Sequence, residues 1–409
     1  MRTGSNGCGL ARGTGPRSHV QRAIDGLKKR VAILGSTGSI GRNCLDVLGG
    51  LGDEFEVVGL AARGSWQLLA QQSEQWHPRL VALCDAEHAG ALRNSLNGTT
   101  GVLDGPEAMT TLIDECECDT VVCAVVGAAG LAATHRAVER GLRVALANKE
   151  AMVVAGALLV SLARERGALI IPIDSEHSAV FQAMQAGRPD EVRRVILTAS
   201  GGPFREWTRE QIAEATVADA LNHPTWDMGP KISIDSATMM NKALEIIEAR
   251  WMFGLEPENI EVIIHPESIV HSLVEFCDGS IIAQLGMPDM RIPIQYALTY
   301  PERRNCPSDR LDLTTLRQLT FEEPDEERFP ALRLGREAAC RGGSAGAVLN
   351  AANEAAVGLF REGKIRFAAI SELVERALDG HHWLASPSLE DLMAADRWAR
   401  DEVTQCATG

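Results

Sequence analysis

The feature that most constrains this chain is a glycine-rich turn between a short apolar run and a helical pattern. The run occupies residues 30–34, the turn is Gly35-Ser36-Thr37-Gly38-Ser39-Ile40-Gly41, and the helical pattern continues through Leu48. A strand, such a turn and a helix in this order suit a pyrophosphate, because glycines let the backbone come close and the helix N-terminus offers free N–H groups. The alternative is a glycine-rich turn that binds no ligand.

Apolar runs typical of β-strands alternate with helical patterns through the first half of the chain. The later runs occupy residues 55–62, 80–84, 120–126, 143–147 and 168–173, and helical stretches include 131–140 and 151–166. This alternation predicts an α/β fold that begins with a Rossmann-type, doubly wound parallel sheet. Ligands of such sheets bind in the crevice at the carboxyl ends of the strands.

The second half follows two other patterns. Strand-like runs at 192–199, 263–264, 271–276 and 281–285, the last two joined by a hairpin signal at 278–280, predict antiparallel strands in a central α+β domain, suited to forming a dimer through a sheet. Helical patterns at 331–341, 345–362, 367–378 and 389–406 predict a C-terminal helical domain with a structural role.

Composition and charge narrow the class of protein. The chain has 409 residues, 45% hydrophobic and 23% charged, which is typical of a soluble globular protein with two or three domains. Its net charge of -15 argues against nucleic acid or a membrane surface as the main partner. Ten cysteines without disulfide-framework spacing favour a reducing compartment, hence the cytoplasm. The basic, acid-poor leader keeps organelle targeting open as an alternative.

The end of the second predicted strand indicates which dinucleotide is bound. An acidic residue about 20 positions after the glycines would accept from the ribose hydroxyls of NAD. Here the strand ends in Arg63-Gly64-Ser65, without such an acid. This favours NADP(H), whereas a solvated loop charge at Arg63 is the alternative.

Two carboxylates directly follow the run 168–173, in the segment Asp174-Ser175-Glu176-His177. Asp174 and Glu176 repel one another unless a cation lies between them, and oxygen ligands suit a hard ion such as Mg²⁺ or Mn²⁺. The alternative is a polar strand end that starts a helix, with Asp174 or Ser175 as the N-cap.

A third carboxylate lies on a later predicted helix, which Asp235-Ser236 can cap and which ends before Gly254. Its polar stripe of Asn241, Glu245 and Glu248 borders the core face, with Lys242 adjoining. Glu245 is either a third metal ligand beside Asp174 and Glu176 or a solvated helix acid.

Two loops suit an anionic ligand. Ser200-Gly201-Gly202-Pro203-Phe204 follows a strand, and its successive N–H groups could form an anion-binding nest, although such a turn is equally common without a ligand. Residues 222–231, with two prolines and Trp226, have the composition of a lid that closes over a substrate and excludes water. His223 could donate to a phosphate or cap this loop. Asn148-Lys149-Glu150 follows another strand and should face the same crevice.

Six ordered motifs together resemble the 1-deoxy-D-xylulose 5-phosphate reductoisomerase family. They are residues 35–41, Leu146-Ala147-Asn148-Lys149-Glu150, residues 174–177, residues 200–204, Asp235-Ser236-Ala237-Thr238-Met239-Met240-Asn241-Lys242 and Leu349-Asn350-Ala351-Ala352-Asn353-Glu354. The resemblance implies an enzyme that rearranges and reduces 1-deoxy-D-xylulose 5-phosphate to 2-C-methyl-D-erythritol 4-phosphate, in the non-mevalonate route to isoprenoid precursors. It also implies NADPH, a divalent metal (Mg²⁺ or Mn²⁺, with Co²⁺ as a further candidate) and a homodimer.

The resemblance assigns roles to individual residues. The metal ligands would be Asp174, Glu176 and Glu245. The substrate would meet Lys149, Ser175, Glu176, Ser200, His223, Ser236, Asn241, Lys242 and Glu245, with Lys149, Glu176 and His223 as catalytic residues. NADPH would contact Thr37, Gly38, Ser39 and Ile40 through its pyrophosphate, Arg63, Gly64 and Ser65 through its 2′-phosphate end, and Asn148, Glu150 and Gly229 on its nicotinamide side. Arg63 stands where family members commonly have Gly.

These patterns predict five segments and leave two rivals. The segments are a disordered basic leader at 1–28, an NADPH-binding domain at 29–173, a catalytic and dimerisation domain at 174–300, a linker at 301–325 and a helical domain at 326–409. One rival is a Rossmann dehydrogenase of the homoserine or semialdehyde type, which does not need three carboxylates and a phosphate nest together. The other is an NADP-binding sensor, for which we expect cofactor affinity independent of metal and no turnover.

Overall fold

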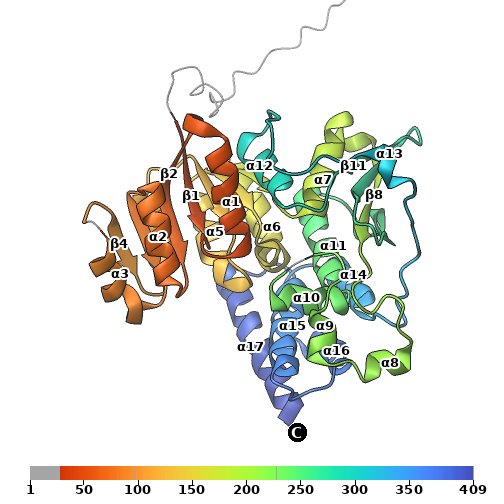
Figure 1. Ribbon diagram of the computed structural model, residues 1–409. Coiled ribbons are helices and arrows are strands. Elements are labelled where there is room, and N and C mark those ends of the chain that lie inside the picture. The colour runs from red at the N-terminus through yellow and green to blue at the C-terminus, as the bar shows by residue number, and fades with distance from the viewer. Residues whose placement is uncertain (1–27, 97, 227, 409) are drawn as a thin grey trace, which may run out of the picture.

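The computed structural model describes residues 28–96, 98–226 and 228–408 (Figure 1). Its first part is a seven-stranded, wholly parallel sheet in the order β4-β3-β2-β1-β5-β6-β7. The strands are β1 (Lys29–Leu34), β2 (Phe55–Ala62), β3 (Leu80–Leu83), β4 (Gly101–Asp104), β5 (Thr120–Cys123), β6 (Arg143–Leu146) and β7 (Leu169–Pro172). The main helices between them are α1 (Ser39–Gly50), α2 (Trp66–Trp76), α3 (Ala89–Ser95), α4 (Ala108–Glu115), α5 (Leu131–Glu139) and α6 (Lys149–Arg166).

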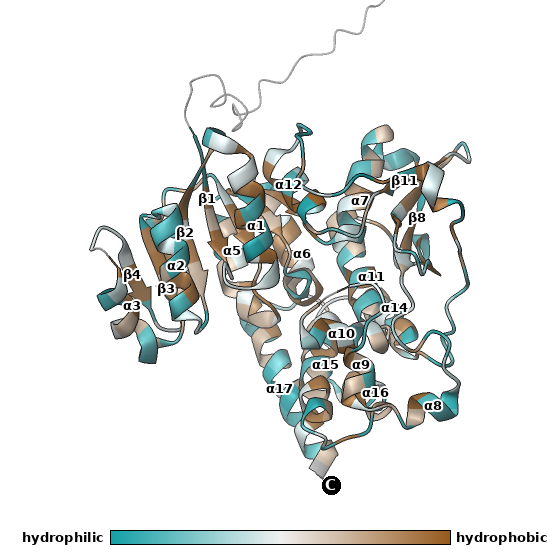
Figure 2. Cartoon of the chain, in the orientation of Figure 1, coloured by the Kyte–Doolittle hydropathy of each residue, from teal (hydrophilic) through white to brown (hydrophobic). Residues whose placement is uncertain are grey.

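The apolar runs form strands because the sheet is covered on both faces. Residues 31–34 of β1 are fully buried, and the strands of this sheet are mostly hydrophobic while the outer faces of α1 and α2 carry polar residues (Figure 2). The predicted α/β fold with a Rossmann-type sheet is confirmed. Strand β4 was not predicted, because this edge strand has four residues and is only partly buried.

A second, four-stranded sheet has the order β11-β10-β8-β9. Its strands are β8 (Val192–Ala199), β9 (Ile260–Ile264), β10 (Val270–Phe276) and β11 (Ile281–Leu285), and α7 (Ser175–Ala183) packs against β10 and β11. Strand β10 pairs antiparallel with both neighbours, as predicted. The prediction of antiparallel pairing is wrong for β9, which runs parallel to β8. A parallel pair needs a long crossover connection, and here that connection includes α10 and α11.

The other regular elements of the described chain are mainly helices. They are α8 (Arg209–Ala213), α9 (Val217–Leu221), α10 (Pro230–Ala237), α11 (Met240–Phe253), α12 (Arg291–Thr299), α13 (Leu313–Leu316), α14 (Ala331–Arg341), α15 (Ala345–Arg361), α16 (Ala369–Gly380) and α17 (Leu389–Thr408). Within the described ranges, no helix is both long enough and apolar enough to cross a membrane. The predicted leader at 1–28 lies outside the described residues, apart from Lys28.

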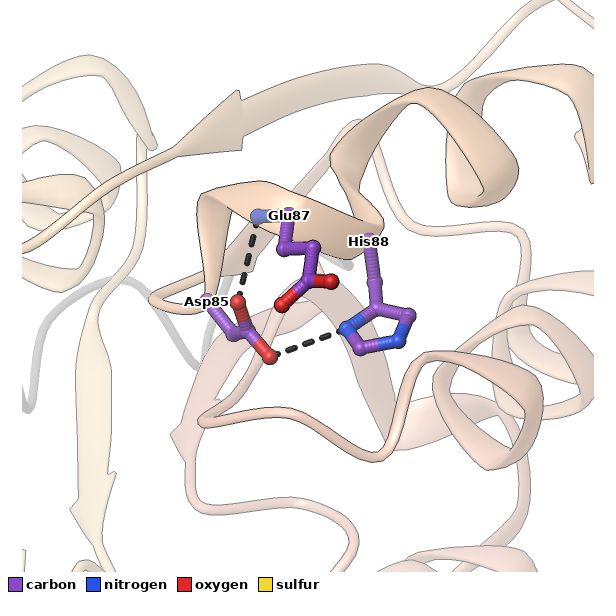
Figure 3. Close-up of side chains that lie close together, drawn as sticks. All are labelled: Asp85, Glu87 and His88. Atoms are coloured by element: carbon purple, nitrogen blue, oxygen red, sulfur yellow. Dashed lines mark hydrogen bonds and ion pairs between the residues drawn. The ribbon is translucent and has the colours of Figure 1, made fainter.

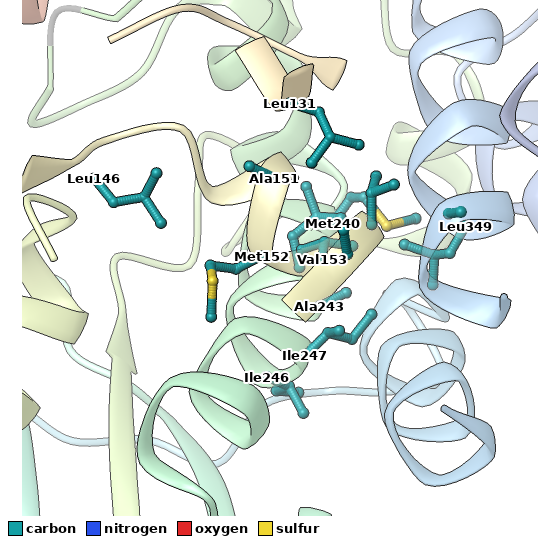
Figure 4. Packing of buried hydrophobic residues seen from close by; sticks show 14 of the residues in the cluster. Leu131, Leu146, Ala151, Met152, Val153, Met240, Ala243, Ile246, Ile247 and Leu349 are labelled. Carbon is teal, nitrogen blue, oxygen red and sulfur yellow. The ribbon is translucent and has the colours of Figure 1, made fainter. Parts of the chain in front are cut away.

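Helix α11 joins the parts of the molecule. It packs on α6 and α14, and its Met240, Ala243 and Ile247 lie beside Val153 of α6 and Leu349 of α15 (Figure 4). Its start differs from the prediction, because Met239 adopts a left-handed conformation with φ 62° and separates α11 from α10. Asp235 and Ser236 therefore lie in the last turn of α10 and do not cap α11.

Candidate active site

A cavity of about 190 Å³ lies where the carboxyl ends of β6, β7 and β8 meet the beginnings of α1 and α11. Parallel strands end at one edge of a sheet, so side chains that follow different strands gather there. Of the predicted site residues, the cavity is lined by Ser39, Ile40, Lys149, Asp174, Ser175, Glu176, Ser200, His223, Gly229, Ser236, Asn241, Lys242 and Glu245. Thr37, Gly38, Arg63, Gly64, Ser65, Asn148 and Glu150 lie outside this lining.

Three carboxylates come to the cavity from two elements. Asp174 follows β7 and caps α7, since its Oδ1 accepts from the backbone N–H of Glu176 at 3.2 Å. Glu245 reaches the same place from α11 and is fully buried. One oxygen each of Asp174 and Glu245 and a ring nitrogen of His177 lie within 4.8 Å of one another. Asp174 is therefore the N-cap of α7 and also lines the cavity, while its role as a metal ligand stays a prediction.

Two lysines neutralise these carboxylates. Lys149 Nζ lies 2.6 Å from Asp174 Oδ2 and 3.0 Å from Glu245 Oε1. Lys242 Nζ lies 3.0 Å from Glu176 Oε1 and also donates to Glu245 Oε2. Burial opposes ionisation of Asp174, yet Lys149 and His177 hold the pKa of this carboxyl well below its usual value. For Glu245, burial and the nearby Glu176 raise the pKa, against the pull of both lysines.

The donor set fits a hard divalent cation. Asp174, Glu176 and Glu245 offer only oxygen atoms, which suits Mg²⁺ or Mn²⁺, and Glu245 is removed from water. The ammonium groups of Lys149 and Lys242 contact these carboxylates, so a divalent ion bound here would replace them as the counter-charge.

His177 supports the carboxylates from behind. Its Nδ1 lies 3.2 Å from Asp174 Oδ1 and 3.4 Å from Glu248 Oε2, and its Nε2 lies 3.1 Å from the backbone oxygen of Glu245. Burial disfavours the charged ring, but Glu248 and Asp174 raise the pKa of His177 to about 9. For Glu248, burial disfavours the charged carboxylate and raises its pKa to about 7. No role for His177 was predicted, and its spacing three residues after Asp174 was the available signal.

The Ser200 turn and the predicted lid form the other side of the cavity. Gly201 and Gly202 follow Ser200 with φ values of 84° and 67°, and the N–H of Gly202 donates to Ser200 Oγ at 3.2 Å. His223 Nε2 lies 2.9 Å from Ser200 Oγ, while its Nδ1 accepts from the N–H groups of Thr225 and Trp226. His223 therefore caps the lid and contacts Ser200 of the predicted phosphate turn, while its donation to a phosphate stays a prediction. Trp226 and Met228 line the cavity from the lid.

The glycine-rich turn opens onto the same cavity through Ser39 and Ile40. A Cβ on Gly41 would lie 2.3 Å from the backbone oxygen of Gly35, so this turn accepts no side chain there. Arg63 directly follows β2 and is exposed, so the predicted contact of its guanidinium with the 2′-phosphate of NADP is sterically open.

A buried cluster behind the cavity was not predicted. Lys231 Nζ lies 2.8 Å from Glu150 Oε1 and 2.9 Å from Asp235 Oδ2. Asn148 donates to Glu150, and Asn353 of α15 donates to Asp235. Asn148 and Glu150 therefore hold the structure behind the predicted nicotinamide side. The spacing of four residues between Lys231 and Asp235 was the local signal, but Glu150 and Asn353 are far away in the sequence.

The fold and the cavity place the chain in the class of Rossmann-type proteins, with a cavity lined by charged and polar side chains at the carboxyl ends of the strands. The glycine-rich turn and the Ser200 turn open onto one cavity, with the carboxylate cluster between them. Three family models match the chain: 1-deoxy-D-xylulose 5-phosphate reductoisomerase over residues 31–156, the C-terminal domain of 1-deoxy-D-xylulose 5-phosphate reductoisomerase over 170–253, and the DXP reductoisomerase C-terminal domain over 285–402. The chain belongs to the 1-deoxy-D-xylulose 5-phosphate reductoisomerase family.

Individual relatives agree over nearly the whole chain. The 1-deoxy-D-xylulose 5-phosphate reductoisomerase of Geotalea uraniireducens is 50% identical over 378 residues, which cover 92% of this chain and 98% of that protein. The solved structure of the Zymomonas mobilis enzyme in complex with NADPH has a TM-score of 0.88 at 43% identity, covering 93% of this chain and 99% of that one. A DOX-P reductoisomerase structure with NADPH, fosmidomycin and magnesium has a TM-score of 0.88 at 39% identity, covering 93% and 98%.

Proposed function

We propose that this chain catalyses the NADPH- and divalent-metal-dependent conversion of 1-deoxy-D-xylulose 5-phosphate to 2-C-methyl-D-erythritol 4-phosphate, a step of isoprenoid precursor biosynthesis. One observation carries the proposal. The carboxylates of Asp174, Glu176 and Glu245 line a single cavity together with Ser39 of the glycine-rich turn and Ser200 of the predicted phosphate turn. A metal, a nicotinamide and a phosphorylated substrate could therefore meet there.

Asp174, Glu176 and Glu245 would hold Mg²⁺ or Mn²⁺. When bound, the ion supplies Lewis-acid stabilisation of negative charge on substrate oxygens, and NADPH supplies the hydride. The described geometry favours all-oxygen ligation of a hard ion over a site with sulfur ligands, because the cavity lining contains no cysteine among the described residues.

The lysines have the second role in this proposal. Lys149 Nζ lies between Asp174 and Glu245, so a chelated substrate oxygen would come within its reach, and Ser175 adds a hydroxyl at the same edge. Fixed positive charge where an oxyanion develops lowers the barrier, since the donor needs no reorientation during the reaction. We therefore propose Lys149 as a catalytic residue, together with Glu176 and His223, which the family resemblance assigns to the same role.

The phosphate would bind away from the reacting carbons, at Ser200, Ser236, Asn241 and Lys242, with His223 donating from the lid. Ser200 and Ser236 lie on facing turns, because a Cβ on Gly202 would lie only 2.6 Å from the backbone oxygen of Ser236. Binding energy from this remote group supplies orientation and lid closure, which excludes water from the reaction. Gly229, Thr37, Gly38, Ser39, Ile40, Arg63, Gly64 and Ser65 would contact NADPH, with Asn148 and Glu150 supporting the nicotinamide side.

The test is the absorbance of NADPH in the presence of 1-deoxy-D-xylulose 5-phosphate, with and without a chelator. We expect Glu245→Gln to abolish metal-dependent NADPH oxidation while NADPH affinity stays near that of wild type. Glu372→Gln, which changes an exposed acid on α16, is the matched control and should keep full turnover. Retained turnover in Glu245→Gln would reject the ligand assignment. Wild-type protein that binds NADPH without any turnover would favour the sensor rival.

A homodimer completes the proposal. Strand β11 is an edge strand of the four-stranded sheet, and its Ile281, Ile282 and Leu285 are exposed. An exposed apolar edge invites pairing with another strand, and a two-fold axis there would join two sheets. We also propose the cytoplasm as its location, supported by the free cysteines of the described chain. The boundaries after residues 173, 300 and 325 remain our proposal for the domains.

A further inference from the structure

The ends of β2 and β3 bring a carboxylate beside the segment that we assign to the 2′-phosphate of NADPH. Asp85 follows β3, and its backbone N–H donates to the carbonyl oxygen of Arg63 at 2.8 Å. A Cβ built on Gly64 would lie 3.5 Å from Asp85 Oδ2. The Asp85 carboxylate therefore lies directly beside residues 63–65, where Rossmann-type sheets place the adenosine ribose.

A free carboxylate at this place would oppose binding of NADPH. Acidic side chains near the ribose accept from the 2′-hydroxyl of NAD, whereas they repel a 2′-phosphate. A free Asp85 would also compete with the phosphate for the exposed Arg63 guanidinium. The chain therefore needs a device that occupies Asp85.

His88 provides that device. Its Nδ1 lies 2.9 Å from Asp85 Oδ2, and the backbone N–H of Glu87 donates to Asp85 Oδ1 at 3.1 Å, so both carboxylate oxygens have partners (Figure 3). The hydrogen bonds from His88 and from the backbone N–H of Glu87 lower the pKa of Asp85, which favours its ionised form. Both side chains are partly exposed, 37% for Asp85 and 43% for His88, which leaves them open to a bound nucleotide.

We propose that His88 is a specificity-determining residue for NADPH, because its hydrogen bond fixes the Asp85 carboxylate, which would otherwise be free to turn toward the Arg63 guanidinium and the 2′-phosphate. This inference rests on the proposed function, since it requires a dinucleotide in the crevice of the parallel sheet. The sequence indicated the preference for NADP(H) only through residues 63–65, which follow β2. The inference adds His88, which follows β3, as a second determinant of that preference.

The experiment measures KM and kcat for NADPH and for NADH in His88→Ala, Asp85→Asn and the double variant. For His88→Ala we expect KM for NADPH to rise roughly fivefold to tenfold at low ionic strength, and less in high salt, because the released carboxylate faces the phosphate. KM for NADH should change much less. Asp85→Asn in the His88→Ala background should restore the NADPH value, because the offending charge is gone. Glu87→Gln, which neutralises an acid on the same turn, is the control for net charge.

The outcomes separate this inference from the proposed function. An unchanged ratio of NADPH to NADH KM in His88→Ala overturns the role of His88. A double variant as weak as His88→Ala overturns the mechanism through Asp85, and so does an equal weakening for both nucleotides, which is the result of a merely structural role. Wild-type protein that binds neither nucleotide would instead overturn the proposed function.

Discussion

Replacing Lys231 by methionine should destabilise the protein strongly, because the change removes the ammonium group that joins Glu150 to Asp235. The three side chains are only 15%, 7% and 2% exposed, at distances of 2.8 and 2.9 Å. Burial opposes the charge on Lys231, yet Asp235 and Glu150 raise the pKa of this group above its usual value. Breaking a buried pair by removing one partner costs roughly 3–5 kcal/mol, since an unpaired charge is left behind.

The structure narrows this range. Asn148 still donates to Glu150 at 3.1 Å and Asn353 still donates to Asp235 at 2.7 Å in the variant, so each carboxylate keeps one partner. We therefore expect a loss of roughly 3 kcal/mol in the free energy of unfolding, at the low end for such a deletion. Because Glu150 and Asn148 follow β6 behind the predicted nicotinamide side, KM for NADPH should also rise.

Urea unfolding followed by circular dichroism measures the loss. The matched control is Lys364→Met, which makes the same change in a pair whose side chains are 62% and 59% exposed. It should cost less than about 1 kcal/mol, as exposed ion pairs do. If Lys231→Met lost no more free energy than Lys364→Met, the reasoning from burial would be refuted.

Three further predictions follow from the site and the edge strand. Gly202→Ala should lower the free energy of unfolding by at least roughly 2 kcal/mol and raise KM for the phosphorylated substrate, because φ is 67° and the new Cβ would meet the backbone of Ser236. A variant with the stability and KM of wild type would contradict this. Burial lowers the pKa of His223, so the folded lid favours the neutral ring, and the stability that this ring contributes is lost as the pH falls below about 6.5. Limited proteolysis of the lid should therefore accelerate at lower pH. A cleavage rate independent of pH would contradict this role of His223. Ile281→Lys should give a monomer by light scattering while Leu313→Lys, at another exposed apolar position, should not, and a dimer in both would exclude the β11 edge.

Patterns of burial made the fold predictable. Strand β8 and helix α14 lie at the predicted residues 192–199 and 331–341, because β8 contains a buried, mostly apolar run and α14 has an apolar face at helical spacing. The direction of β9 could not be predicted, since five residues of a strand look alike whether they pair parallel or antiparallel. The break at Met239 was hidden as well, because a left-handed methionine leaves no trace in apolar spacing.

The residues of the site also differ in whether the local sequence could predict their roles. Asp174 and Glu176 stand out because an apolar strand stops at them, which is a local pattern. Glu245 could not be placed from spacing alone, because its distance from Asp174 depends on the packing of α11 against α6. The role of Lys231 was out of reach for a similar reason, since its partner Glu150 lies 81 residues earlier in the chain.

The two lysines explain how the carboxylate cluster can exist inside a folded protein at all. Buried acids without partners would be protonated or would destabilise the chain, because desolvation disfavours their charge. Lys149, together with His177, keeps Asp174 ionised, and Lys242 contacts Glu176 and Glu245. Lys149 also donates to Asn241. If Asp174, Glu176 and Glu245 hold a divalent ion as proposed, both ammonium groups would be available to an anionic substrate. On the proposed ligand set, the same lysines would stabilise the carboxylates before an ion binds and would afterwards face an anionic substrate.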